Sequence, residues 1–90
     1  MINEALIESL ELALDNHPYV AVEFTTKSGK VRVMRCTKML SAIPEEHHEG
    51  RYDFKINHPS IIGVWDLQNS AWRSFRKDSV LSFEAHVNVY

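Results

Sequence analysis

Six arginine and tryptophan side chains in this chain have the chemistry of a nucleic-acid-binding surface. They are Arg32, Arg35, Trp65, Trp72, Arg73 and Arg76. A guanidinium group binds phosphate and an indole ring stacks on bases, so together they form a recurring surface for single-stranded nucleic acid. If a tryptophan and these arginines share one sheet face, the sequence predicts a site for nucleic acid, single-stranded nucleic acid in particular.

The two tryptophans also fit a purely structural role. Side chains alternate between the faces of a strand, so only one of Val64 and Trp65 points to the core. An inward-facing Trp65 would be a core anchor that buries up to about 250 Å². The sequence leaves both roles open for Trp65 and Trp72.

Basic residues gather in the segment 27–38, which holds five lysines and arginines and no acidic residue. Such a segment attracts a polyanion even though the formal net charge of the chain is −2. It also fits an ordinary solvated hairpin. The negative net charge argues against strong, sequence-independent DNA binding.

Acidic residues gather at the N-terminus and suggest a different function. Residues 1–18 contain no Lys or Arg, and four acidic residues recur there at the spacing of one helix face: Glu4, Glu8, Glu11 and Asp15. A field of this sign can steer a protein to a basic surface. The alternative prediction is therefore a modulator that binds a host protein and inhibits or redirects it.

Motifs for catalysis or metal binding are missing from the sequence. His47 and His48 lie among glutamates without the spacing of a metal site, so we expect a solvated acidic loop there. Cys36 has no second cysteine to pair with and no nucleophile motif, and we expect a small buried side chain. We therefore predict a binding protein that is not an enzyme and uses no metal or cofactor.

One helix and one hairpin begin the chain. Apolar residues recur at helical spacing from 3 to 15, with Asn3 as the N-cap, and Pro18 stops the helix. An apolar period of two then predicts a strand from about residue 19, followed by a hairpin turn at 27–30.

The return strand, residues 31–37, carries much of the basic segment. We expect Val31 and Val33 to face the core, and Arg32 and Met34 to face solvent. Arg35 breaks this alternation, which predicts a bulge.

Three further strands are expected at 61–67, 71–75 and 80–87, with turns at 68–70 and 76–79. The connection 38–60 is long for a small domain, so we expect it to carry function or a short extra strand near 52–56. The pattern predicts one domain over residues 1–90, mainly β, with an N-terminal helix in 1–18 and a small bent barrel in 19–90.

A cytoplasmic location is expected. One cysteine suits a reducing compartment, and neither a signal peptide nor a membrane span is recognisable. Open barrel edges would also allow copies of the chain to pair as a homo-oligomer.

Three stretches of the sequence resemble a known family. "VEFTTKSGKVRVMRCT", then "IPEE" and "GVWDLQNSAWRSFRKDSVLSF", are similar to the small stand-alone WYL-type domains of bacteriophages, over about residues 20–84. The resemblance implies a five-stranded Sm-like SH3 β-barrel. It also implies a phage-encoded regulatory module in the host cytoplasm that binds nucleic acid or a transcription-related ligand.

The resemblance also suggests individual positions. The name-giving Trp-Tyr-Leu of the larger family's regulators matches Trp65, Asp66 and Leu67. Asp66 departs from this pattern, so no role of the tyrosine carries over. Arg73 and Arg76 are the best matches for the basic residues that follow the hairpin in that family.

Overall fold

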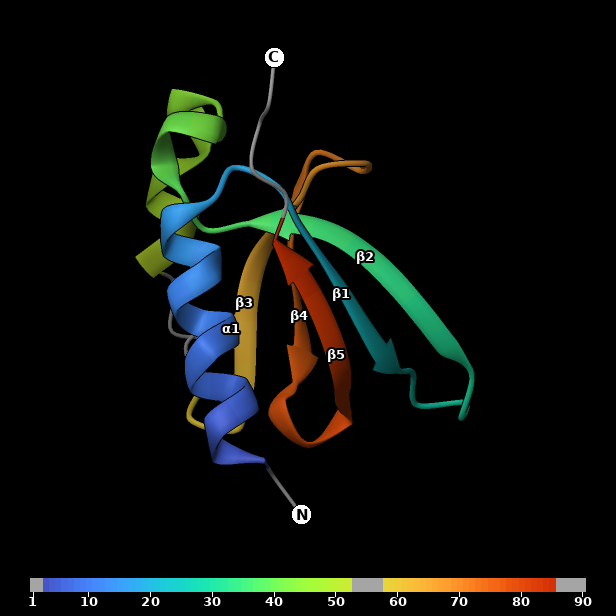
Figure 1. Cartoon of the computed structure of the whole chain (residues 1–90). Helices are drawn as coiled ribbons and strands as arrows, with labels where there is room; N and C mark the ends of the chain where they lie inside the picture. The colour runs from blue at the N-terminus through green and yellow to red at the C-terminus, as the bar shows by residue number, and fades with distance from the viewer. Residues whose placement is uncertain (1–2, 53–57, 86–90) are drawn as a thin grey trace.

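A computed structural model describes residues 3–52 and 58–85 of the chain. A helix and five strands follow in order: α1 (Glu4–Asn16), β1 (Val20–Thr25), β2 (Val31–Thr37), β3 (Ile61–Asp66), β4 (Ala71–Arg76) and β5 (Val80–Ala85). The strands form one bent antiparallel sheet in the order β4-β3-β2-β1-β5, which leaves β4 and β5 at its edges (Figure 1). The predicted mainly β fold with an N-terminal helix is confirmed.

Helix α1 covers one side of the sheet and contacts β2 and β5 (Figure 1). The Asn3 side chain accepts a hydrogen bond from the Leu6 N–H at 3.1 Å, which satisfies one of the free N–H groups at the helix start. The helix buries three apolar side chains: Ile7, Leu10 and Leu14. Packing of this face stabilises a helix too short to persist alone.

The core lies between α1 and the inner face of the sheet. Strands β1 to β4 supply the buried strand residues of the core, which are Val20, Val22, Phe24, Met34, Cys36, Ile62, Val64 and Phe75, and β5 adds partly buried apolar side chains. The rings of Phe24 and Phe75 stack with centroids 5.3 Å apart. This contact joins β1 to β4, two strands that are not neighbours in the sheet.

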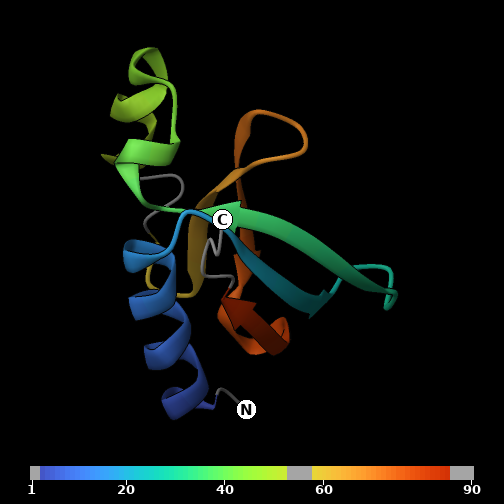
Figure 2. The same cartoon turned by 45° about the horizontal axis from the view of Figure 1, so that its top comes forward.

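Hairpin β1–β2 projects beyond the body of the molecule (Figure 2). Its turn contains Gly29 with φ +87°, in the left-handed region that favours glycine. The predicted orientation of β2 is wrong, because Met34 is buried while Val31 and Val33 are exposed. Only Cys36 and Thr37 of β2 pair with β3, so the first half of β2 lies outside the core. Cys36 is buried, and the side chains of β2 that share its face are therefore the ones that point inward.

The predicted bulge at Arg35 is also wrong. Pairing between β1 and β2 is continuous from Val20 to Thr25. The irregularity lies on the other side of β1, where the register with β5 shifts between Glu23 and Phe24.

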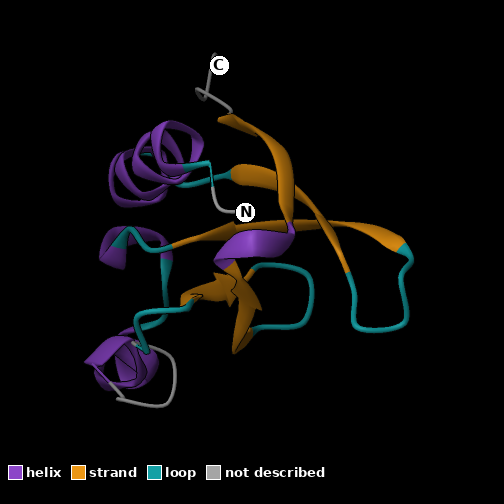
Figure 3. Cartoon of the chain, turned by 90° about the horizontal axis from the view of Figure 1, so that it is seen from below, coloured by secondary structure: helices purple, strands orange, loops and turns teal. Residues whose placement is uncertain are grey.

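The remaining connections are mostly short 3-10 helices. η1 (Leu40–Ala42) and η2 (Glu45–Tyr52) lie between β2 and β3, and η4 (Lys77–Ser79) replaces the predicted turn between β4 and β5. Figure 3 shows η1 and η2 on the same side of the molecule as α1, away from the projecting hairpin. Of the extra strand expected near 52–56, Tyr52 belongs to η2, and 53–57 lie outside the described residues. Within the described ranges, no helix is long and apolar enough to cross a membrane.

Candidate functional site

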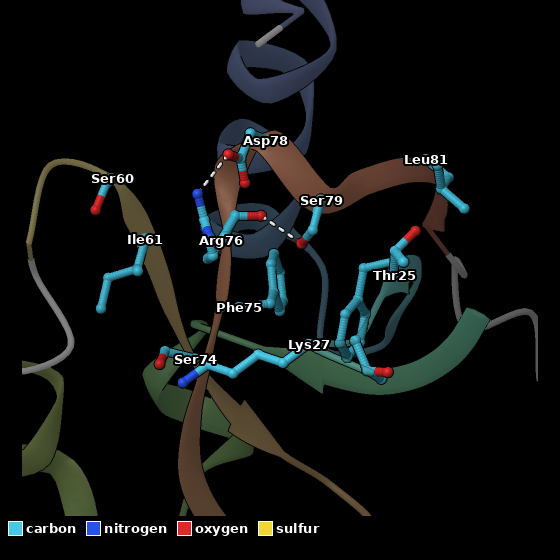
Figure 4. Close-up of a pocket in the computed structure, with 12 residues that line it drawn as sticks. Thr25, Lys27, Ser60, Ile61, Ser74, Phe75, Arg76, Asp78, Ser79 and Leu81 are labelled. Atoms are coloured by element: carbon cyan, nitrogen blue, oxygen red, sulfur yellow. Dashed lines mark hydrogen bonds and ion pairs between the residues drawn. The ribbon is translucent and has the colours of Figure 1, made fainter. Parts of the chain in front are cut away.

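An open groove of about 860 Å³ lies along the free edge of β4 (Figure 4). Three consecutive residues of β4 line it, namely Ser74, Phe75 and Arg76. Consecutive residues point to opposite faces of a strand, so the groove follows the strand's edge. The end of β1, the turn after it, η4 and the start of β5 form the other walls.

The charged groups of the groove are Lys27, Arg76 and Asp78. Arg76 Nη2 lies 2.7 Å from Asp78 Oδ2, and the arginine side chain is 65% exposed. The Lys27 side chain extends across the groove towards Ser74 (Figure 4), and within residues 3–52 and 58–85 it forms no ion pair. The groove therefore carries two cations against one carboxylate.

Hydroxyl groups surround these charges. Five serine and threonine residues line the groove: Thr25, Thr26, Ser60, Ser74 and Ser79. In the part of the chain that the structure describes, the hydroxyls of Thr25 and Ser74 have no internal hydrogen bond, whereas Ser79 Oγ donates to the Arg76 carbonyl at 2.7 Å. Cations and free hydroxyl donors together suit a phosphate or another oxyanion.

The floor of the groove is apolar. The stacked rings of Phe24 and Phe75 lie there, both buried, with Ile61 and Leu81 at the sides. The groove thus offers charged and hydroxyl groups for an oxyanion beside apolar surface for the rest of a ligand.

The six predicted contact residues do not share one sheet face, so that expectation is wrong. Arg32 lies directly opposite Phe24 in the hairpin, on the face that turns towards the groove. Arg35 lies opposite Ala21, on the other face of β2. Arg73 and Arg76 are three residues apart on β4 and therefore also point to opposite faces.

Arg73 has a partner inside the chain. Its Nε lies 3.3 Å from Oδ2 of Asp66, whose side chain is only 1% exposed. Asp66 also accepts bonds from the Gln68 and Asn69 N–H groups at 2.9 and 3.2 Å and from Asn69 Nδ2 at 2.8 Å. Arg73 therefore balances a buried charge that holds the β3–β4 turn, and is less available to a ligand than Arg76.

The Asp66 carboxyl has a lowered pKa. Burial by itself raises the pKa, but the side-chain and backbone bonds from Asn69, the Gln68 N–H and the charge of Arg73 outweigh it. The carboxyl therefore stays ionised in the folded protein at neutral pH. Asp66, which departs from the resemblance at this position, serves as an anchor of the turn.

The two tryptophans lie on the face of β3 and β4 that is turned away from the core. Trp65 and Trp72 are directly opposite each other, with ring centroids 5.6 Å apart and planes at 76°. Trp65 is buried at 3% exposure, and Trp72 is half-buried. Trp65 is thus a packed residue, as the structural role predicts, but it contacts His47 of η2 and is not part of the main core cluster.

Residues of η2 contact both rings. The His47 ring lies 5.0 Å from Trp65 between centroids, and Trp72 Nε1 donates a hydrogen bond to the His47 carbonyl at 2.8 Å. His48 Nε2 lies 2.7 Å from the Ile43 carbonyl oxygen. The predicted loop is a 3-10 helix, Glu45–Tyr52, that contacts both tryptophans. Its glutamates and His47 are exposed, as predicted for a solvated acidic segment.

Two of the four acidic residues of α1 have cationic partners from elsewhere in the chain. Asp15 pairs with Arg51 at 3.0 Å, and Glu11 lies 3.8 Å from Lys77. Glu4 and Glu8 are exposed. The acidic face therefore also holds α1 against η2 and η4, which reduces the charge left for a partner.

Cys36 is buried, as predicted, and no group of three metal-ligating side chains gathers within the described residues. Burial, with a smaller effect of Asp66, raises the pKa of the Cys36 thiol to about 12. This thiol stays protonated at neutral pH and is not a nucleophile.

Sequence reasoning missed most of the groove. Lys27 was visible only as one member of the basic segment, and Ser74 and Phe75 lie between the predicted arginines without a motif. The sequence did indicate that Lys27 lies at the tip of a hairpin. Nothing in the sequence indicated that this tip lies opposite β4.

Comparison with protein-family models decides the family. A model described as WYL_2, Sm-like SH3 beta-barrel fold, matches residues 7–81, from α1 into β5. The chain belongs to this family. The resemblance drawn from the sequence is confirmed, and membership of this WYL_2 domain family indicates a small binding module. The family description names no source, so a bacteriophage origin stays a prediction.

Searches of curated proteins and of solved structures found no match to this WYL_2 domain.

Proposed function

We propose that this WYL_2 domain binds single-stranded nucleic acid, with the groove at the edge of β4 as its phosphate-binding element. The observation that carries the proposal is that two cations, Lys27 and Arg76, line the same open groove together with free hydroxyl groups. Arg32 adds a third cation on the inner face of the hairpin. Sm-like and OB barrels use sheets and loops in this way.

The groove favours a single strand over a duplex. It is an open groove bounded by the turn of the projecting hairpin and by η4, and it has an apolar floor. A flexible strand can place a phosphate between Lys27 and Arg76 while its bases lie along the neighbouring surface. Duplex readout instead needs an element that enters a groove of the double helix, commonly an exposed recognition helix.

In this proposal the domain is a non-enzymatic regulatory module. Its role is to hold a strand, and no catalytic step is assigned to the groove residues. Binding to a protein through α1 remains the alternative, with Glu4 and Glu8 as the acidic residues not engaged in the ion pairs described above.

The test measures fluorescence anisotropy of labelled single-stranded DNA and RNA at low salt, about 50 mM. We expect micromolar binding that weakens as salt rises. Lys27→Ala should weaken binding, since a phosphate contact is lost. It should also reduce the slope of log affinity against log salt concentration by about one. Lys30→Ala is the matched control, because Lys30 lies in the same turn but does not line the groove. Absence of binding to every oligonucleotide would falsify the proposal.

A gain of affinity is expected at Asp78. This carboxylate binds Arg76 within the groove and competes with a ligand phosphate. Asp78→Asn should raise oligonucleotide affinity about two- to fivefold, in line with the energy of a surface ion pair. Glu8→Gln makes the same change in charge on exposed α1 and serves as the control. Equal affinities of the two variants would show that Asp78 has no local role.

A further inference from the structure

Trp65 is a buried tryptophan outside the main core cluster. It is 3% exposed, yet it is not part of the core cluster between α1 and the sheet. The ring of His47 in η2 lies against it, and no residue of η2 is itself buried. A polar 3-10 helix therefore lies against a buried tryptophan.

The contact on Trp65 is a tilted contact between two aromatic rings. The planes of Trp65 and Trp72 meet at 76° and form a corner. His47 is exposed and contacts both tryptophans, with its ring tilted by 39° against Trp65 and its carbonyl accepting a hydrogen bond from Trp72 Nε1. An imidazole is a planar nitrogen heterocycle, and so is a nucleobase. A side chain of the chain itself therefore occupies a position that suits a base.

The corner continues the groove along β4. Alternation places Trp72, Ser74 and Arg76 on one face of this strand, and the last two line the groove. Four residues of extended strand span about 13 Å. A single nucleic-acid strand whose phosphate lies at Arg76 can therefore follow β4 to the corner formed by Trp72.

The polar contacts that hold η2 in place include a hydrogen bond and an ion pair. Besides the bond between Trp72 and His47, the ion pair of Arg51 with Asp15 ties η2 to α1, and the side chains of that pair are 28% and 47% exposed. Exposed ion pairs contribute little to stability. Displacement of η2 would break the hydrogen bond of Trp72, the contact of His47 with Trp65 and the close approach of Gly50 to Trp72.

We propose that the corner between Trp65 and Trp72 is a nucleobase site, and that His47 occupies it until a base displaces its ring. The inference rests on the proposed function, because the base belongs to a strand held in the groove. It adds a second contact to the phosphate site, and it makes η2 a competitor that lowers the affinity of the resting protein. Bound bases then stack on the indole rings.

The experiment compares His47→Ala with His47→Phe. The probe is a single-stranded DNA hexanucleotide with 2-aminopurine at its centre, a base whose fluorescence is quenched by stacking. The alanine variant removes the imidazole from Trp65. It should therefore bind the probe about five- to tenfold more tightly than wild type, at the low end of the range for one base stack, and quench it more strongly. The phenylalanine variant keeps a ring on Trp65 and should not bind more tightly than wild type.

Circular dichroism and thermal melting establish that both variants are folded. The inference is wrong if His47→Ala binds no more tightly than wild type, or if the probe stays unquenched while anisotropy reports binding. If wild type binds and Lys27→Ala weakens it in the same experiment, the phosphate groove stands and only the nucleobase site fails. Failure of wild type to bind any oligonucleotide overturns the proposed function and this inference together.

Discussion

At the scale of single residues, the charged groups of β3 and β4 have different tasks despite their similar types. Arg73 neutralises the buried carboxylate of Asp66, whereas Arg76 pairs with exposed Asp78 at the rim of the groove. A buried, fully bonded carboxylate contributes to stability, while an exposed pair contributes little and is easily exchanged for a ligand. Arg73 is therefore a structural residue, and Arg76 remains the candidate for binding.

Asp66→Asn tests this assignment by its pH dependence. The folded protein lowers the pKa of Asp66 below its ordinary value of 3.8, so its stabilisation is complete above about pH 4 and is lost as the pH falls through the folded pKa. We expect Asp66→Asn to lower the free energy of unfolding by about 1.5–3 kcal/mol at pH 7, the range for hydrogen bonds to a charged group. Urea unfolding measured at several pH values should show this difference shrinking below pH 4.

Asp15→Asn is the matched control for this measurement. Its carboxylate is half-exposed in a pair with Arg51 and should change stability by less than about 1 kcal/mol. A pH-independent difference between wild type and Asp66→Asn would mean that the Asp66 charge does not stabilise the fold.

At the scale of elements, the contact of η2 with the β3–β4 hairpin depends on a glycine. A Cβ placed on Gly50 would overlap the indole ring of Trp72, so η2 and this ring approach each other as closely as the backbone permits. The sequence offered Gly50 only as the end of a polar stretch. Its role depends on two elements more than twenty residues apart, which the hydrogen bond between Trp72 and His47 joins.

Gly50→Ala should separate η2 from Trp72. We expect a loss of about 1–3 kcal/mol in the free energy of unfolding, as for other overpacked contacts, together with red-shifted tryptophan emission as Trp65 meets water. Gly29→Ala is the control, because its cost arises from φ +87° and no atom lies near its Cβ position. That variant should lose stability without a shift in emission. An unshifted emission spectrum for Gly50→Ala would show that the position of η2 does not depend on the close approach of Gly50 to Trp72.

At the scale of the whole molecule, opposite charges lie on opposite sides. α1 with its acidic face lies on one side and the basic β1–β2 hairpin projects on the other (Figure 1). The molecule extends over 35 × 32 × 23 Å, several times the Debye length of about 8 Å at physiological salt. Exposed Glu4 and Glu8 should therefore have little influence on binding at the groove in a cell. Glu11 differs from them, because it lies 3.8 Å from Lys77 of η4, beside a wall of the groove.

Neutralising Glu4 and Glu8 together tests this separation. At physiological salt, Glu4→Gln/Glu8→Gln should change oligonucleotide affinity by less than about twofold, because solvent screens these exposed charges. The same anisotropy titration at low salt should show a larger increase. A change of an order of magnitude at physiological salt would mean that α1 lies close to the bound strand, against the proposed site.

The sequence by itself determined the order of elements, the Asn3 cap, the two hairpin turns and the buried state of Cys36. These depend on local periodicity, capping and turn chemistry, which act over a few residues. It could not determine which face of β2 is buried, because that depends on where β3 pairs, at Cys36 and Thr37. Nor could it separate the tasks of Arg73 and Arg76, since each follows from a partner, Asp66 or Asp78, and from the free edge of β4. The groove and the corner under His47 are assembled from segments distant in sequence, and only tertiary packing brings those segments together.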